Sequence, residues 1–258
     1  MSEKIIQTYE NSADDYVFFE NIIIPLFTGT IHKKIFTAVY ALDGKIIIAS
    51  DQFAGYFGFT SSQQVQGKTL REISEIAKLD KFITLTERLN EIRLKVISSG
   101  TVITHLNLVP FQNKTLTSIV YNLPIYSTDG SKVLATRAIA RKIDLANSVS
   151  AMNNSLINEP PIAKINPLSL QLSPRQNEII YLLTIGFSQS QAADYLDITR
   201  GTISKIISEN ICPLFNIAGS NTKLLVKTII ASKYFETFSN PFLEPRIIEI
   251  DSNIELTI

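Results

Sequence analysis

A stretch of Asn, Ser and Pro near the middle of the chain constrains the fold more than any other feature. Residues 146–171 read ANSVSAMNNSLINEPPIAKINPLSLQ, and Pro160, Pro161 and Pro167 exclude a continuous helix or a central strand there. Before this segment the apolar residues alternate as in strands, whereas after it they recur at helical spacing. We therefore interpret 146–171 as a linker between two domains, for which 258 residues are sufficient.

Composition excludes several classes of site. Lys and Arg together number 24, as do Asp and Glu, so the formal net charge is zero and any attraction to nucleic acid must come from a local patch. The single cysteine, Cys212, excludes an intrachain disulfide and a Cys-rich zinc site. The two histidines, His32 and His105, leave little for a metal centre, so we expect no metal.

The hydropathy pattern excludes a membrane protein. The longest apolar runs are far too short to cross a bilayer. The N-terminus is acidic after Lys4 and lacks the hydrophobic core of a signal peptide. We expect a cytoplasmic protein with no membrane partner.

The first half of the chain is predicted to form an antiparallel sheet with helices. A hairpin turning at Asp43-Gly44 precedes a long helix that ends at Gly100, and strands follow over 101–111, 116–126 and 131–141. A helix over 14–28 comes before the hairpin. Its predicted apolar face consists of Val17, Phe18, Ile22, Ile23 and Leu26.

Local patterns in this half resemble the PAS family. Ser50-Asp51-Gln52-Phe53, followed by Phe57-Gly58-Phe59-Thr60, resembles the family's hairpin exit and short-helix signature. The run from Leu123 to Gly130 resembles its closing hairpin. The resemblance covers residues 31–145 and implies a sensory domain with a five-stranded antiparallel sheet and flanking helices. Residues 1–30 then form an N-terminal helical segment.

The PAS resemblance implies a small ligand or a protein partner for this domain. No cysteine precedes Cys212, which argues against a flavin adduct, and the long helix contains no histidine, which argues against haem. We interpret His105 as an ordinary strand histidine and the Phe-rich segment 53–59 as core filler. An unidentified small ligand and a ligand-free interaction module both stay open, and no cofactor-binding residue is assigned.

Four helices are predicted after the linker. Ser173 and Ser188 each begin a helix with a capping box, in which Ser caps the helix and a Gln three residues later reaches back. Thr199 caps a third helix that runs to about Cys212, where Pro213 ends or kinks it. A fourth helix is predicted over 221–235.

Two short helices joined by a tight turn form a helix-turn-helix, and here the sequence resembles the LuxR family. The resemblance covers residues 172–238 and implies a transcription regulator that binds double-stranded DNA in the major groove, as a homodimer, and is not an enzyme. The residues that carry it are Leu172-Ser173-Pro174-Arg175, Glu178-Ile179, Leu182-Leu183, Gly186-Phe187-Ser188, Ala193, Leu196, Ile198, Thr202-Ile203, Glu209-Asn210-Ile211 and Asn216-Ile217.

Two groups of candidate DNA contacts follow from the position of residues at helix amino ends. The recognition helix contributes Arg200, Thr202, Ser204, Lys205 and Ser208, which are predicted to face base edges. The amino ends of the second and fourth helices are predicted to meet phosphates. Their candidates are Ser188, Gln189, Thr222 and Lys223.

Sparse basic charge leaves a second interpretation open. The segment 172–235 holds six basic and four acidic residues, and the family resemblance implies basic residues where this chain has Gly201, Ile206 and Ile207. The recognition helix is also one residue longer before Glu209 than the family resemblance implies. Few cations predict weak, salt-sensitive DNA binding. The alternative is a protein-interaction or anti-regulator module whose helix-turn-helix does not bind DNA.

The tail, residues 239–258, shows strand periodicity. Ile248 and Ile250 alternate with acidic residues, and Ile254, Leu256 and Ile258 alternate with Glu255 and Thr257. A lone hairpin is marginal in water. We therefore expect at least one strand over 247–258, packed on a sheet edge or on a partner chain.

Overall fold

The structure is a computed structural model that describes residues 13–30, 35–111, 114–143, 165–237, 242 and 245–250. The chain divides into two compact units. The sheet unit comprises Met1–Asn107, Ser118–Lys142 and Pro245–Ser252, and the helical unit comprises Leu108–Thr117, Ile143–Glu244 and Asn253–Ile258. Residues 146–164, which are most of the expected linker, lie outside the described residues.

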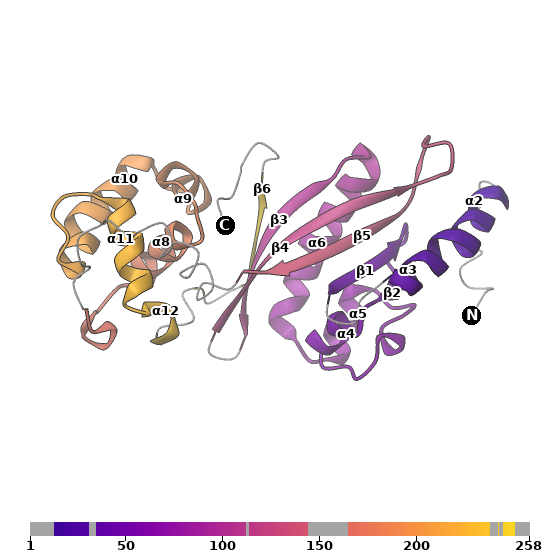
Figure 1. Ribbon diagram of the computed structural model, residues 1–258, viewed down its shortest axis with the longest axis horizontal. Helices are drawn as coiled ribbons and strands as arrows, with labels where there is room; N and C mark the ends of the chain where they lie inside the picture. Colours follow the sequence, from indigo (N-terminus) through magenta and orange to yellow (C-terminus); the bar gives the residue numbers. More distant parts are fainter. Residues whose placement is uncertain are drawn as a thin grey trace. The chain divides into compact units, whose positions relative to one another are not determined.

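A single sheet organises the sheet unit (Figure 1). Its strand order is β2-β1-β5-β4-β3-β6, and β5 pairs antiparallel with both β1 and β4. The predicted α+β fold with an N-terminal antiparallel sheet is therefore confirmed, and so is a strand in the tail. The strands are β1 (Phe36–Ala41), β2 (Ile46–Ala49), β3 (Ile103–Phe111), β4 (Lys114–Tyr126), β5 (Val133–Lys142) and β6 (Arg246–Ile250).

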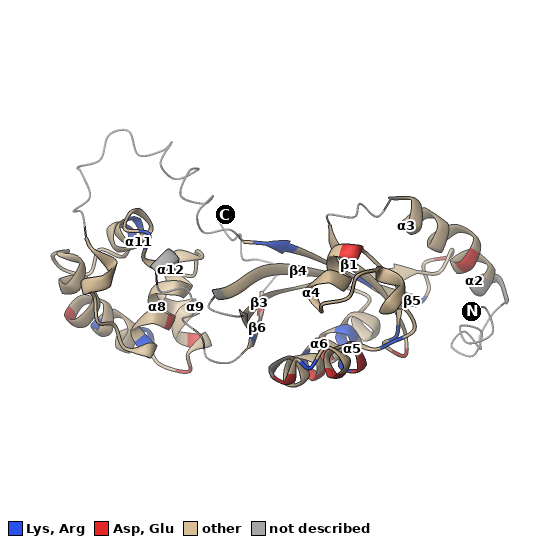
Figure 2. Cartoon of the chain, turned by 90° about the horizontal axis from the view of Figure 1, so that it is seen from below, with Lys and Arg blue, Asp and Glu red and all other residues tan. Residues whose placement is uncertain are grey.

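Short helices and one long helix follow the first hairpin. In Figure 2 the two longer ones, α5 and α6, lie on one face of the sheet. Gly100 ends α6 with a positive φ of 63°, a conformation that glycine adopts without strain. These elements are α4 (Asp51–Tyr56), η2 (Ser62–Gln64), α5 (Leu70–Ile76) and α6 (Asp80–Ser99).

Aromatic rings from this segment pack on one another as the sequence predicts. Neighbouring ring centroids lie 5.1 to 5.7 Å apart in tilted and edge-to-face arrangements. The rings therefore fill core space. They belong to Phe36, Phe53, Tyr56, Phe57 and Phe82.

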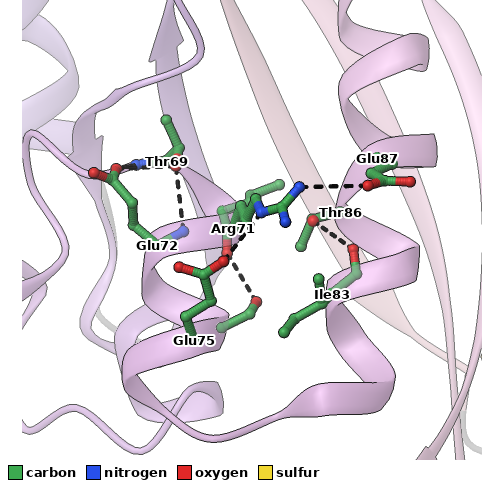
Figure 3. A network of polar contacts seen from close by, with 9 residues as sticks. Thr69, Arg71, Glu72, Glu75, Ile83, Thr86 and Glu87 are labelled. Atoms are coloured by element: carbon green, nitrogen blue, oxygen red, sulfur yellow. Dashed lines mark hydrogen bonds and ion pairs between the residues drawn. The ribbon is translucent and has the colours of Figure 1, made fainter.

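Polar contacts hold α5 and its neighbour α6 in register (Figure 3). Thr69 caps α5 in a capping box with Glu72. Arg71 pairs with Glu75 at 3.0 Å on its own helix and with Glu87 on α6 at 3.4 Å. The side chains of Arg71, Glu75 and Glu87 are largely exposed, so their ion pairs contribute little to stability.

The N-terminal helix confirms one prediction and corrects another. It spans α2 (Ala13–Phe18), a π-helical turn η1 (Phe19–Ile23) and α3 (Ile24–Thr30). The predicted apolar face was wrong for Val17, Ile22 and Leu26, which are more than half exposed. A π turn holds more residues per turn than an α-helix, so it rotates the apolar stripe. The residues that pack on β1, β2 and β5 are Phe18, Phe19, Ile23, Ile24 and Phe27.

The helical unit begins with the two predicted capping boxes, on Ser173 and Ser188. The predicted fourth helix is shorter than expected, because Lys233 adopts a left-handed φ of 57° after α11. A separate short helix, α12, follows. The elements are η3 (Pro167–Ser169), α8 (Pro174–Thr184), α9 (Gln189–Tyr195), α10 (Arg200–Lys205), η4 (Ile206–Ile211), η5 (Cys212–Phe215), α11 (Thr222–Ala231) and α12 (Tyr234–Thr237).

Candidate nucleic-acid interface

Helices α9 and α10 form the predicted helix-turn-helix. Asp197 makes the turn with a left-handed φ of 54°, and the Ile198 N–H donates to the Ala193 carbonyl over 3.0 Å. Ala192 and Ala193 are fully buried, and their small side chains let α10 approach α9 closely. The turn at Asp197 and the two alanines therefore determine how α10 packs on α9.

The recognition helix buries one face and exposes the other. Thr199 caps it, accepting from the Thr202 N–H at 3.1 Å. Ile203, Ile207 and Ile211 recur every fourth residue and are completely buried. The amino end and the opposite face are therefore left to solvent.

The recognition helix contains a π turn. The helix changes from α10 to the π-helical η4 at Ile206, and the Cys212 N–H bonds to the Ile207 carbonyl, five residues back. The family resemblance implies one additional residue before Glu209, and a π turn is how a helix accommodates a single insertion. Pro213 then begins the tighter turn η5, as expected at a residue that cannot continue an α-helix.

Five predicted base contacts lie on this helix, and the structure separates them. Arg200, Thr202 and Lys205 are exposed. Ser204 and Ser208 are half-buried, and the Ser208 hydroxyl donates to the Lys205 carbonyl at 3.2 Å. The three exposed residues are therefore the accessible ones of the five, and the Thr202 hydroxyl also bonds to the Thr199 hydroxyl at 2.9 Å.

The predicted phosphate contacts come together at the amino ends of α9 and α11. The Gln189 side-chain amide donates to the Thr222 hydroxyl at 2.7 Å, so these two residues already satisfy each other. Ser188 is exposed and caps α9 through the Gln191 N–H. Lys223 is exposed in the first turn of α11.

Fewer cations are available for DNA contact than the sequence suggests, because Arg175 and Lys227 are held within the helical unit. Arg175 pairs with Glu178 at 3.0 Å and donates to the Leu196 carbonyl at 3.1 Å, so it joins α8 to the end of α9. Lys227 is buried, with 4% of its surface exposed. Figure 2 shows the charged residues of the helical unit scattered over its helices.

Sequence reasoning missed an acidic residue on the candidate surface. Glu209 is exposed one turn after Lys205, and their charged atoms are 4.0 Å apart. Its position follows from the i, i+4 spacing of the two residues, which is visible in the sequence. The carboxylate partly offsets the charge that Lys205 would offer a phosphate.

The sheet unit contains a second polar site, buried rather than exposed. His105 on β3 is fully buried, and Asn122 on β4 contacts its Nδ1 at 2.9 Å. Burial lowers the pKa of His105 to about 4, so the ring is neutral at pH 7. His105 Nε2, Asn107 Oδ1 and Thr136 Oγ1 are buried without a hydrogen-bond partner of ordinary geometry in the described part of the chain, and the Asn107 side chain beside the His105 ring favours the protonated form of the ring.

Register places these groups on a common face of the sheet. Asn122 pairs with Ala138 across β4 and β5, and Thr136 is two residues from Ala138. Side chains two residues apart on a strand share a face. Sequence reasoning treated His105 as an ordinary strand histidine, and only the strand pairing brings Asn122 to its side.

The described residues contain neither a group of three or more His, Cys, Asp or Glu side chains placed to hold a metal ion nor a helix long and apolar enough to cross a membrane. Cys212 is a free, buried thiol. These observations concern the described ranges only.

Comparison with solved structures gives matches over most of the chain. A phage VqmA in complex with DPO matches with a TM-score of 0.53 and 16% identity, covering 92% of this chain and 98% of that chain. The chain has the two-domain fold of the phage VqmA. A VqmA–ligand–DNA complex from Vibrio cholerae has a TM-score of 0.49 at 13% identity, covering 90% of this chain and 98% of that one.

A further solved structure matches about half of the chain. The PAS domain of BvgS from Bordetella pertussis is 18% identical with a TM-score of 0.41, and the match covers 53% of this chain and 98% of that chain. No family model matches the sequence, and no curated protein matches it. The likeness is one of fold, and the function has to be argued from the residues of this chain.

Proposed function

We propose that this protein is a DNA-binding transcription regulator whose PAS-like sheet unit senses a small ligand or a protein partner. The observation that supports DNA binding is the capped amino end of the recognition helix, with Arg200, Thr202 and Lys205 exposed on it. Arg and Lys at this end can contact guanine edges or phosphates in the major groove.

The sensing role rests on the buried polar groups of the sheet. Buried polar atoms normally have a hydrogen-bond partner, so His105 Nε2, Asn107 Oδ1 and Thr136 Oγ1, which lack one of ordinary geometry within the described residues, support a polar ligand in this part of the sheet unit. The ligand would be a small neutral molecule that forms hydrogen bonds, because the His105 ring is neutral at pH 7. A ligand of this kind would stabilise the sheet unit.

A homodimer is part of the proposal. Two copies can contact two half-sites at once, which multiplies the modest affinity expected from few cations. The exposed apolar residues Val17, Ile22 and Leu26 of the N-terminal helix offer a surface for a second copy. These residues recur at intervals of five and four, so they form one stripe across the π turn.

The test compares loss of a cation on the recognition helix with loss of a cation elsewhere. DNA is first selected from a random library with the full-length protein. Arg200→Ala and Lys205→Ala should each weaken binding to that DNA by about 1–3 kcal/mol if the side chain reaches a base. Lys142→Ala removes an exposed charge from β5 of the sheet unit and should leave the affinity unchanged.

The second candidate function is an interaction module whose helix-turn-helix does not bind DNA. Glu209 on the exposed face and the internal use of Arg175 favour it. If the library yields no enriched DNA at low salt, or if both alanine variants bind as the unsubstituted protein does, this second candidate replaces the first.

A further inference from the structure

Strand β6 covers one edge of the sheet in the sheet unit. It follows β3 in the strand order and is the outermost strand on that side (Figure 1). Residues 246–250 of β6 and residues 103–107 of β3 belong to the same compact unit. Strand β6 also contacts α6 of that unit.

The two strands at this edge differ in how firmly the core holds them. His105 and Leu106 of β3 are completely buried, whereas all five residues of β6 are only half-buried. A strand with little buried surface opens more readily than a core strand. If β6 leaves, β3 stays in place and presents unpaired N–H and C=O groups, which are a template for another strand.

Two cations of α6 hold the side chain of Glu249 on β6. Its carboxylate accepts from the Arg88 guanidinium at 2.7 Å and from the Lys95 ammonium at 2.8 and 3.0 Å. Arg88 and Lys95 are two turns apart and lie on one face of α6. Their side chains are 45% and 49% exposed, so the two ion pairs select a carboxylate at this position but hold it weakly.

The same carboxylate acts electrostatically on the buried histidine of β3. Burial is the main cause of the lowered pKa of His105, and the Glu249 carboxylate opposes it by favouring the protonated ring. The Arg88 guanidinium acts in the same direction as burial. Replacement of the strand at this edge therefore changes the charge that His105 experiences.

We propose that the β3 edge, with Arg88 and Lys95 beside it, is a binding site for an extended segment of a partner protein, and that β6 occupies this site as an intramolecular substitute. Strand β6 shows the chemistry that the site accepts, because its Glu249 carboxylate lies between the aliphatic side chains of Ile248 and Ile250 in sequence. In strand addition, main-chain hydrogen bonds give affinity and the side chains give specificity.

The inference deepens the proposed function, since it gives the chemistry of the protein partner that the sheet unit would sense. It rests on the proposed function only for the consequence of binding. The binding itself depends on the edge of β3 and on the two cations of α6.

The test frees the edge in the full-length protein and supplies the strand as a separate peptide. The probe is a fluorescein-labelled peptide with the sequence of residues 245–251, and binding is measured by fluorescence anisotropy. In the unsubstituted protein the attached β6 competes at high effective concentration, so we expect little binding. Glu249→Lys places a cation against Arg88 and Lys95, which frees the edge and should tighten peptide binding by at least roughly tenfold.

Reversal of the charges tests the role of the two cations. A peptide with Lys at the position of Glu249 should not bind the Glu249→Lys protein. It should bind the full-length chain with Arg88→Glu and Lys95→Glu, in which the attached Glu249 is repelled. Glu91→Lys is the matched control, since Glu91 also pairs with Arg88, at 2.6 Å, but belongs to α6. It should bind the peptide no better than the unsubstituted protein.

A double substitution, Ile247→Pro with Ile248→Pro, frees the edge without a change of charge. Successive N–H groups of a strand point to opposite sides, so one of the two prolines removes a donor to β3. This protein should also gain peptide binding.

The proposal is overturned if neither the Glu249→Lys protein nor the double proline variant binds the peptide, or if the Lys peptide binds the Glu249→Lys protein equally well. Dissociation of a dimer of the unsubstituted protein by the peptide, seen in sedimentation, would also overturn it, because the occupant would then be β6 of a second copy. None of these measurements uses DNA, so the site can fail while DNA binding stands, and DNA binding can fail while the site is confirmed.

Discussion

At the scale of single residues, the candidate interface is balanced between attraction and repulsion. Arg200 and Lys205 are exposed at the recognition helix, but Glu209 occupies the same exposed side one turn further on. Exposed ion pairs contribute little to stability, so the Lys205–Glu209 pair at 4.0 Å is of small structural value. The main effect of the Glu209 carboxylate is to repel a polyanion that approaches this side of the helix.

Removal of that acid should strengthen DNA binding. Glu209→Gln keeps the size of the side chain and abolishes its repulsion of phosphates, so we expect affinity to rise roughly two- to fivefold at low salt and the gain to shrink as salt is added. The measurement is a fluorescence-anisotropy titration at two salt concentrations. Glu91→Gln, an equal charge change on α6, is the control, and equal affinities for the two variants would contradict this reasoning.

The buried His105 predicts a pH dependence of stability. Its pKa is about 4 in the folded protein and about 6.5 in an unfolded chain, so the unfolded state binds the proton more tightly. Stability is complete above pH 6.5 and is lost as the pH falls toward 4, by up to about 3 kcal/mol. Urea unfolding of the protein and of His105→Gln at several pH values isolates this loss. A difference between the two that does not vary with pH would refute it.

At the scale of elements, two π turns change which residues reach the surface. The turn η4 lies within the recognition helix, and η1 rotates the apolar stripe of the N-terminal helix. Helical periodicity predicts the existence of both helices. Helical periodicity does not predict how a π turn rotates the buried face, because a π turn is stabilised by the packing of the residues before and after it.

The rotated stripe predicts a dimer contact. Leu26 is 56% exposed, and burial of a leucine at an interface contributes roughly 1.5–3 kcal/mol. Leu26→Glu should therefore shift the protein toward monomer in sedimentation at micromolar concentration without lowering its melting temperature. Leu168→Glu, at a position that is 73% exposed in the helical unit, should leave the dimer intact. A monomeric unsubstituted protein, with and without DNA, would exclude this contact.

At the scale of the whole molecule, the tail belongs to the fold of both units. It contributes buried Phe242 to the helical unit and β6 to the edge of the sheet. An uncovered sheet edge invites pairing with other chains, and β6 covers the edge of β3. Residues 251–258, the rest of the predicted strand-like tail, lie outside the described residues.

Truncation after Asn240 tests this contribution. Loss of a buried phenylalanine costs about 3–5 kcal/mol in typical cores, and the edge strand adds to that. We expect the melting temperature to fall by several degrees and the truncated protein to aggregate more readily. An unchanged melting curve, together with free-peptide exchange rates for the tail amides of the full-length chain, would show that the tail is not part of the fold.

The sequence by itself determined the local features of this protein. Capping boxes at Ser173 and Ser188, the Thr199 cap, the Gly100 helix end and the turn at Gly44 all depend on residues within a few positions of one another. Local hydrogen bonds and backbone preferences are sufficient for such features. For the same reason the order of helices and strands and the helix-turn-helix could be predicted.

Only the tertiary structure decided which side chains are available. Lys227 counted as a cation in the sequence and is buried, and Gln189 counted as a phosphate contact and bonds to Thr222. The pairing of β6 with β3 joins residues about 140 positions apart, as does the ion pair of Glu249 with Arg88, which are 161 apart. Such contacts depend on packing between distant segments, and no local pattern specifies the partner.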